Sequence, residues 1–247
     1  MSKPKIGLFE AGFYTPEFIA EHGAPGDWFQ RFLGRASNDS LSFEVYRAIE
    51  GELPASVDDC DGYLITGSPA SVIERAPWML ALGDFCVRAM ETKPVVGICF
   101  GHQLLCQALG GEVRAADAGW GIGVHRYAVN GSDDWMDPPL GEVAMLTSHM
   151  DQVTRLPPGA EILASSDFCP NAILRLGPNA ITIQAHPEAT RGCFGSVYEM
   201  RRDRYAPGQA DQALASFEQP TDEDQVGRWL VKFFTDRIDV LSPVPTA

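Results

Sequence analysis

The stretch PVVGICFGHQLLCQALG, residues 94–110, decides the fold of this chain. Its first part, Pro94 to Ile98, is a short apolar run typical of a buried strand, and a helix is predicted to follow as far as about Leu109. Glycines stand two residues before and two residues after Cys99. At a sharp strand-to-helix turn such glycines let neighbouring chain pass closely, while the residue between them takes strained dihedrals. We therefore predict that Cys99 lies at such a turn, where free N–H groups of the helix stabilise a thiolate.

Apolar runs before this stretch predict further strands of one sheet. Strands are expected at 5–9, 41–49 and 62–66, and helices at 29–33 and 77–90. Because helices alternate with continuous apolar strands, we expect a parallel sheet with helices on both faces and right-handed crossovers. The predicted fold class is therefore α/β, with an open and mostly parallel sheet.

The pattern changes after Gly110-Gly111. Loose alternation over 113–129 predicts an antiparallel or irregular ribbon. Further short strands are expected at 142–147, 161–165, 172–176 and 180–184. The last two are predicted to form a hairpin across a Gly-Pro-Asn turn.

The C-terminal part is predicted to be helical. Residues 222–239 have the pattern of an amphipathic helix, and residues 242–247 are expected to be a frayed tail. We expect a single domain over residues 1–247, with the motifs in a core at 5–190 and a helical extension at 191–241.

Composition and charge exclude several classes of function. The chain has 247 residues, 45% hydrophobic and 21% charged, which is ordinary for a globular protein and excludes a disordered or fibrous one. The formal net charge is -14, so we expect neither nucleic acid nor an anionic membrane surface as a partner. No apolar stretch reaches the roughly 18 residues of a membrane span, and the first nine residues lack the features of a signal peptide. A soluble, cytoplasmic protein is expected.

The six cysteines are too few for a disulfide framework, and they include no Cys-x-x-Cys pair that would indicate zinc. Reduced thiols are therefore expected, with no metal site. Cys106 follows Cys99 by seven residues on a similar helix face and is predicted to be a core residue.

A nucleophilic cysteine needs a histidine base and a group that orients it. His149 is followed by Asp151, and His186 is followed by Glu188, so in extended chain either carboxylate lies on the same side as its imidazole. Pro187 keeps His186 extended, which favours the second pair slightly. The residues alone leave both pairs open, and either histidine could instead cap the end of a strand.

Four motifs, in order and spacing, resemble those of the class I (triad) glutamine amidotransferase domain. They are Ile-Thr-Gly-Ser-Pro at 65–69, Gly-Ile-Cys-Phe-Gly-His-Gln at 97–103, Ser-His-Met-Asp-Gln-Val at 148–153 and Ala-His-Pro-Glu at 185–188. The resemblance covers roughly residues 5–190 and is far more specific than one motif. It implies a flavodoxin-like sheet with the site at the carboxyl ends of the strands.

The resemblance also implies a chemistry. Cys99 would be the nucleophile, His186 the base and acid, and Glu188 the orienting carboxylate. The expected reaction is hydrolysis of the γ-amide of glutamine through a γ-glutamyl thioester, releasing glutamate and ammonia, and it requires no metal or organic cofactor.

The oxyanion hole and the substrate side are implied in the same way. The N–H of Phe100 and an N–H of the Gly67-Ser68 turn are expected to bind the oxyanion, and Gln103 and His149 are expected to support the substrate. Many members of the family have glycine where this chain has Ser68. If that position needs a positive φ, serine adds strain of about 1 kcal/mol.

Three interpretations of the biological role remain open. The chain could be an amidotransferase subunit that delivers ammonia to a separate synthase, since the sequence contains neither a P-loop nor a Ser-Gly-Gly-Val-Asp-Ser signature. It could be a stand-alone hydrolase of γ-glutamyl amides or peptides, because the Gly-Ser-Pro variant is similar to that of plant γ-glutamyl peptidases. It could also be a degenerate, non-catalytic binding protein, which the intact set of Cys99, His186 and Glu188 disfavours.

Two groups of side chains outside the motifs have possible roles. A partner-binding apolar patch would support the subunit interpretation and could comprise Trp120, Trp135 or Phe194. A substrate or product carboxylate could be bound by one of Arg191, Arg201, Arg202 and Arg204. For both groups we favour the ordinary alternative: core packing for the aromatic residues, and a solvated helix face with ion pairs for the arginines. Glu10 is expected near the same edge of the sheet as the site.

Overall fold

The computed structural model describes residues 3–241. Nine strands form one sheet in the order β2-β1-β3-β4-β11-β10-β9-β6-β7. The first five strands in this order pair in parallel and the remaining pairs are antiparallel. The predicted open, mostly parallel α/β sheet is therefore confirmed, and the tail predicted at 242–247 lies outside the described residues.

The strands of the large sheet are β1 (Lys5–Phe9), β2 (Ser42–Tyr46), β3 (Gly62–Ile65), β4 (Val95–Ile98), β6 (Gly121–Val129), β7 (Glu142–His149), β9 (Ala160–Ser165), β10 (Ile173–Leu176) and β11 (Ala180–Ile183). A small antiparallel sheet contains β5 (Glu112–Ala115) and β8 (Asp151–Arg155). The helices are α1 (Pro16–His22), α2 (Pro25–Ala36), α3 (Pro77–Ala89), α4 (Phe100–Ala108), α5 (Arg191–Met200), α6 (Gln209–Ala215) and α7 (Glu223–Leu241).

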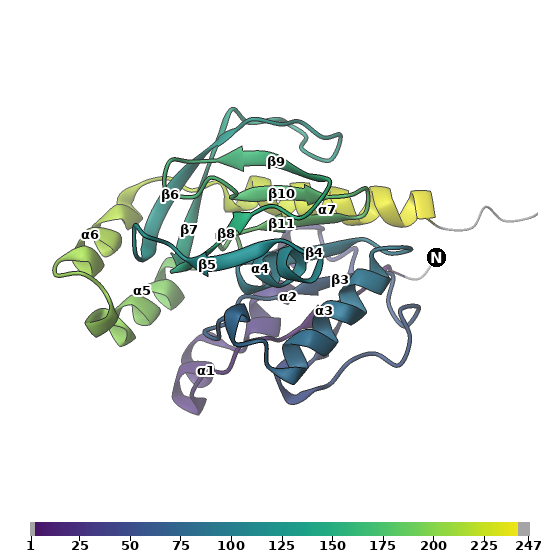
Figure 1. The fold of residues 1–247 in the computed structure, drawn as a ribbon, viewed down its shortest axis with the longest axis horizontal. Helices are drawn as coiled ribbons and strands as arrows, with labels where there is room; N and C mark the ends of the chain where they lie inside the picture. The colour runs from purple at the N-terminus through teal and green to yellow at the C-terminus, as the bar shows by residue number, and fades with distance from the viewer. Residues whose placement is uncertain (1–2, 242–247) are drawn as a thin grey trace, which may run out of the picture.

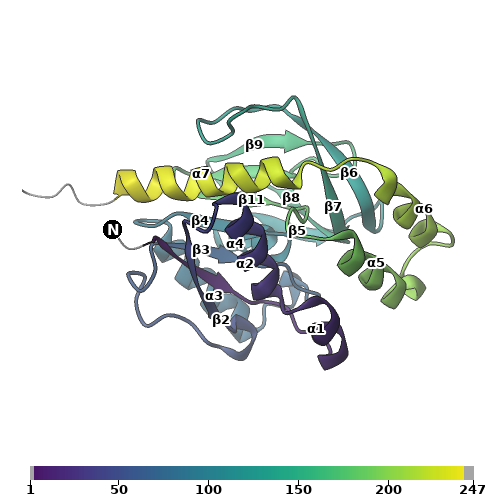
Figure 2. The same cartoon turned by 180° about the vertical axis from the view of Figure 1, so that it is seen from behind.

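Helices cover both faces of the sheet, as the alternating pattern predicts (Figures 1 and 2). Figure 1 shows α3, α4 and the small sheet on the near side, and Figure 2 shows α2 and α7 on the other. Strands β3, β4 and β11 are buried along their whole length because both of their faces are covered. Two apolar clusters result, one on each side of the central strands.

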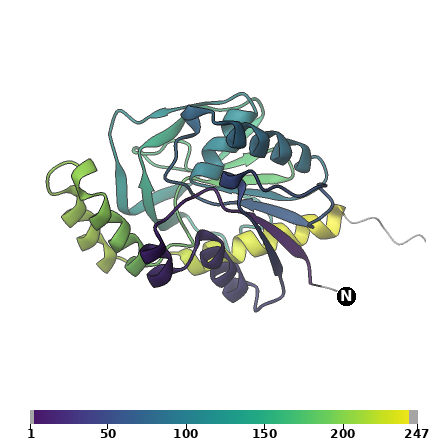
Figure 3. The same ribbon diagram turned by 90° about the horizontal axis from the view of Figure 1, so that it is seen from below.

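A third apolar cluster joins α1 and α2 to α5 and α6 at one end of the molecule (Figure 3). It includes Phe18, Phe194 and Tyr198, all of them buried. These helices come from the two ends of the chain, and they lie beside the carboxyl end of β7, so they form one wall of the region in which the predicted site lies.

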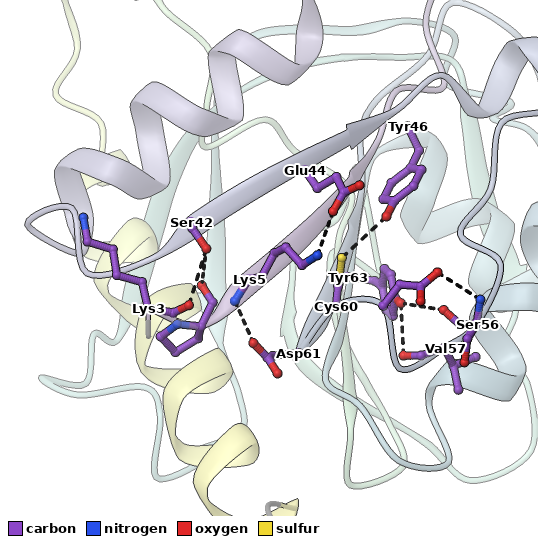
Figure 4. A network of polar contacts seen from close by, with 12 residues as sticks. Lys3, Lys5, Ser42, Glu44, Tyr46, Ser56, Val57, Cys60, Asp61 and Tyr63 are labelled. Atoms are coloured by element: carbon purple, nitrogen blue, oxygen red, sulfur yellow. Dashed lines mark hydrogen bonds and ion pairs between the residues drawn. The ribbon is translucent and has the colours of Figure 1, made fainter. Parts of the chain in front are cut away.

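Polar contacts join β1 to the edge strand β2 and to the residues just before β3 (Figure 4). Lys5 Nζ forms an ion pair with Glu44 at 2.8 Å, and its backbone N–H donates to Asp61 Oδ2 at 2.8 Å. Tyr46 Oη lies 3.8 Å from Cys60 Sγ. Burial raises the pKa of the Cys60 thiol, which fits an unreactive core cysteine.

Most of the expected elements are present, and the exceptions are short. The hairpin of β10 with β11 is confirmed. The sequence did not indicate α1 or β8, and β5 pairs with β8 instead of continuing a ribbon with β6. Across residues 3–241, no helix has both the length and the apolar character needed to cross a membrane.

Candidate active site

The site is built around the turn between β4 and α4. Cys99 occupies that turn with φ of 50° and ψ of -97°, a left-handed conformation that side chains rarely adopt. Its N–H donates to the carbonyl of Ile183 on the neighbouring strand at 2.8 Å, which fixes the strained residue in the sheet. Helix α4 begins at the next residue, Phe100, so the Phe100 N–H has no partner within the helix.

The two glycines flanking Cys99 are required by close backbone contacts. A Cβ at Gly97 would lie 2.5 Å from the carbonyl oxygen of Gly101. A Cβ at Gly101 would lie 2.6 Å from the carbonyl oxygen of Ile65 on β3. Since both neighbours are backbone atoms, neither can move aside for a side chain.

His186 and Glu188 follow β11 and lie on the same side of the chain. His186 Nδ1 is 2.8 Å from Glu188 Oε1, and the N–H of His186 donates to the carbonyl of Leu146 on β7 at 2.8 Å. The His186 ring also contacts the edge of Phe194 on α5. His186 and Glu188 are 8% and 7% exposed, and Cys99 is 5% exposed, so the structure brings three nearly buried polar side chains together.

The electrostatics of this group depend on the three side chains jointly. Burial alone would lower the pKa of His186. The charge interactions and hydrogen bonds with Cys99 and Glu188 outweigh this effect of burial and raise the pKa above its ordinary 6.5. The raised pKa favours a protonated His186 at neutral pH. Such an arrangement can hold a thiolate ready for attack and supply a proton to a leaving group.

The Gly67-Ser68 turn lies against His186. A Cβ at Gly67 would be only 2.6 Å from His186 Cε1, so glycine is needed for the ring to reach its position. Ser68 Oγ accepts a hydrogen bond from the Ala70 N–H at 3.0 Å, which stabilises the turn locally. Ser68 does not have a positive φ, so the strain considered for this serine is absent.

Gln103 and His149 are both turned toward the protein interior. Gln103 Nε2 donates to the carbonyl of Asp151 at 2.8 Å and to Gln184 Oε1 at 3.1 Å. Both N–H groups of the Gln103 amide are therefore used within the fold, and any direct contact with a ligand would be made by Oε1. The His149 ring packs against Phe168 and lines neither cavity near His186.

The second histidine and carboxylate pair does not form. His149 Nδ1 is 3.2 Å from the backbone carbonyl of Asp151, whereas the Asp151 carboxylate accepts a hydrogen bond from Ser71. Burial lowers the pKa of His149 to about 3, so it is neutral at physiological pH. Among the other histidines, buried His102 has its Nδ1 2.8 Å from Thr182 Oγ1. Of the two pairs left open by the residues, the structure places the one at His186 beside Cys99.

Two cavities adjoin His186. The larger, of about 380 Å³, lies on the Glu188 side and is bounded by α2, β7 and α5. The smaller, of about 20 Å³, contains residues that sequence reasoning missed, namely Tyr14 and Ser148. Neither stands in a pattern of its own: Tyr14 lies in a loop before α1, and Ser148 immediately precedes His149 at the end of β7.

The arginines and aromatic residues considered from the sequence have mixed outcomes. Arg202 forms ion pairs with Glu199 and Asp211, as the solvated-face interpretation predicts. Arg191 donates to the backbone carbonyls of Phe217 and Gln219. Arg201 alone of the four lines the small cavity.

The remaining predicted side chains also have local structural partners. Trp135 and Phe194 are buried in the core, and Trp120 packs against Tyr205, so these three do not form an exposed apolar patch. Glu10 Oε1 accepts a hydrogen bond from the Gly26 N–H at the start of α2. Within the described part of the chain, no three His, Cys, Asp or Glu side chains are grouped so that they could hold a metal ion.

An open α/β sheet with a strained cysteine beside a buried histidine and carboxylate is an arrangement suited to cysteine-dependent hydrolysis. The model of the class I glutamine amidotransferase family matches residues 36–201, which is more than half of the chain. The chain therefore belongs to the class I glutamine amidotransferase family, whose members related to it carry the names of hydrolytic enzymes.

Among curated relatives, γ-glutamyl peptidase 3 of Arabidopsis thaliana is 30% identical over 195 residues, covering 75% of this chain and 77% of the relative. A glutamine-hydrolysing GMP synthase subunit of Archaeoglobus fulgidus is 32% identical over 151 residues, covering 60% of this chain and 78% of the relative. Among solved structures, a glutamine amidotransferase of Methylobacillus flagellatus has a TM-score of 0.73 at 24% identity, covering 100% of this chain and 98% of that one. This likeness confirms the fold class.

Proposed function

We propose that this chain hydrolyses the amide bond at the γ-carboxyl of a glutamyl group, with Cys99 as nucleophile, His186 as base and acid, and Glu188 as the carboxylate that orients His186. The observation that carries the proposal is the position of strained Cys99 at a helix start, beside the buried pair of His186 and Glu188. A degenerate binding protein would have no need to maintain this backbone strain.

The first half of the reaction forms a thioester. The Cys99 thiolate attacks the γ-carbonyl carbon, and the carbonyl oxygen becomes an oxyanion. As the carbon–nitrogen bond breaks, protonated His186 gives its proton to the departing nitrogen. The amine leaves, and the γ-glutamyl group remains bonded to the sulfur of Cys99.

The second half releases glutamate. Neutral His186 takes a proton from a water molecule, which attacks the thioester carbon and breaks the carbon–sulfur bond. Glutamate departs with one oxygen from that water, and the protonated imidazole and the thiolate are restored. Glu188 keeps Nδ1 of His186 engaged throughout, so the other ring nitrogen is the one that exchanges the proton.

The oxyanion is assigned to backbone donors at the meeting point of two turns. The Phe100 N–H starts α4, and the Ser68 N–H lies in the turn that packs against His186 through Gly67. We assign Gln103 and His149 to support of the substrate side. Gln103 acts there by tying α4 to β8 and β11, and His149 acts by its place at the end of β7.

Glutamine is the simplest substrate for this chemistry, and the ammonia released could pass to a separate synthase. A γ-glutamyl peptide or amide is the second candidate, and it is favoured by the match to γ-glutamyl peptidase 3, which covers more of this chain than the match to the GMP synthase subunit. We place the reaction in the cytoplasm, a reducing compartment, which suits six cysteines that are all free.

Mass spectrometry of the products tests the proposal. Purified protein is given glutamine and, separately, a panel of γ-glutamyl peptides, and the released glutamate and amine are measured. Cys99→Ala should abolish release, whereas Cys193→Ala removes an equally buried thiol and should retain it. Release from peptides but not glutamine would identify a stand-alone hydrolase, and release from glutamine alone would identify an ammonia donor. Equal activity of Cys99→Ala and the unaltered protein would refute the proposal.

A further inference from the structure

The small cavity beside His186 is lined by one arginine and by several hydroxyl groups. Arg201, which follows α5, lines it together with Tyr14 and Ser148. Within residues 3–241, the Arg201 guanidinium and the Tyr14 hydroxyl have no hydrogen-bond partner, and Arg201 has no ion pair. What distinguishes Arg201 is that it combines this lack of a partner with a half-buried place in a cavity that His186 also lines.

The hydroxyls around Arg201 are unpartnered as well. Ser148 Oγ and Tyr205 Oη are buried and lie near each other, but neither meets the geometry of a hydrogen bond. Burial raises the pKa of Tyr14 and of Tyr205, and the positive charge of Arg201 opposes that rise in both residues. Tyr14 lines the same cavity as Arg201. Buried polar groups normally have partners, so these donors indicate a ligand that brings acceptors.

The neighbouring arginines have different surroundings. Arg202 is exposed and paired with two carboxylates, and Arg191 is held by backbone carbonyls. Arg204 is exposed and does not line the cavity. The unpartnered, half-buried position of Arg201 is therefore specific to the cavity and does not reflect a generally basic surface.

We propose that Arg201, with the hydroxyls of Tyr14 and Ser148, forms a subsite for a carboxylate of the substrate. The inference rests on the proposed hydrolysis of γ-glutamyl amides. A guanidinium binds a carboxylate through two parallel hydrogen bonds, and hydroxyl donors complete the acceptor's coordination. His186 and Ser68 also line this cavity, so a carboxylate bound there lies beside the proposed base and the proposed oxyanion turn.

A γ-glutamyl peptide offers two carboxylates, the α-carboxylate of the glutamyl group and the terminal carboxylate of the leaving peptide. The cavity of about 20 Å³ is only as large as one water molecule, so a bound carboxylate requires the Arg201 side chain to move outward. The two sources predict different substrate dependence, which kinetics can separate.

The test compares Arg201→Met with Arg204→Met as the matched control. KM and kcat are measured for glutamine, for a γ-glutamyl dipeptide and for the same dipeptide with its C-terminus amidated. Arg201→Met should raise KM about 10- to 100-fold for substrates that use the subsite, because about 1.4 kcal/mol is lost per tenfold in affinity. Arg201→Lys, which keeps the charge without the fork, should recover part of that loss.

The pattern across substrates identifies the carboxylate. A rise in KM for the free dipeptide only assigns the leaving-group carboxylate, and an equal rise for all three assigns the α-carboxylate. KM values unchanged in Arg201→Met, as in Arg204→Met, would overturn the subsite. Calorimetric binding of the dipeptide to Cys99→Ala, with and without Arg201→Met, gives the same comparison without turnover, so failure of the hydrolysis proposal is distinguished from failure of the subsite.

Discussion

Gly67→Ala should reduce activity by displacing His186. The added Cβ would lie 2.6 Å from His186 Cε1, whereas non-bonded carbon atoms prefer about 3.5–4.0 Å, so the ring or the turn must shift by roughly 1 Å. A shift of about 1 Å in a reacting group costs about 10²-fold in rate, equivalent to about 2.7 kcal/mol in the activation barrier. Gly67 does not have a positive φ, so alanine adds no backbone strain and the effect isolates the contact.

The assay is kcat/KM for glutamate release from whichever γ-glutamyl substrate is turned over. Gly141→Ala is the matched control, because nothing lies within 4 Å of its added Cβ and its φ is not positive. Thermal unfolding should show that both variants remain folded. Full activity of Gly67→Ala, equal to that of Gly141→Ala, would refute the argument that this glycine sets the position of His186.

Three other perturbations test the same site. Glu188→Gln keeps a hydrogen-bond acceptor for His186 Nδ1 but removes the negative charge of the carboxylate, so kcat should fall at least about 10²-fold. An unchanged kcat would contradict the role of Glu188. His186 is protonated below its raised pKa and loses the proton as the pH rises through that pKa. NMR titration should give a His186 pKa above 6.5 in the unaltered protein and a lower pKa in Cys99→Ala. A pKa at or below 6.5 in the unaltered protein would refute the charge coupling. Ser68→Ala removes only the hydrogen bond from the Ala70 N–H, so it should lower the free energy of unfolding by about 0.5–1.5 kcal/mol. The backbone N–H of residue 68 remains, so the rate should not fall by the roughly 10²-fold that loss of an oxyanion donor causes. A rate loss of that size would show that the Ser68 hydroxyl takes part in the reaction.

The sequence predicted the features that depend on local pattern. Continuous apolar runs predict β3, β4 and β11 because strands buried on both faces need apolar residues at every position. The spacing of glycines around Cys99 predicts the strained turn because those positions have no room for side chains. Helix α1 and strand β8 were missed, since each has fewer than eight residues and little periodicity of its own.

The parts of the site that the sequence did not predict come from tertiary contact. Tyr14, Ser148 and Arg201 are far apart in the chain and meet only because α5 folds back against the N-terminal loop and β7. The choice between the two histidine pairs also depended on the fold: β11 lies beside β4, and this places the chain after β11 next to Cys99. Within the described residues, Trp135 proved to be a core residue packed against α7 because its ring contacts Trp229 and Phe233.

The central claim is that Cys99 carries the γ-glutamyl group during the reaction. The most direct measurement is acid quenching during turnover of a γ-glutamyl substrate, followed by mass spectrometry of the intact protein and of its peptides. The predicted result is a γ-glutamyl thioester on the peptide that contains Cys99, with no adduct on the other five cysteines, for which burial raises the thiol pKa. Glutamate release without any adduct at Cys99, or release that persists in Cys99→Ala, would contradict the account.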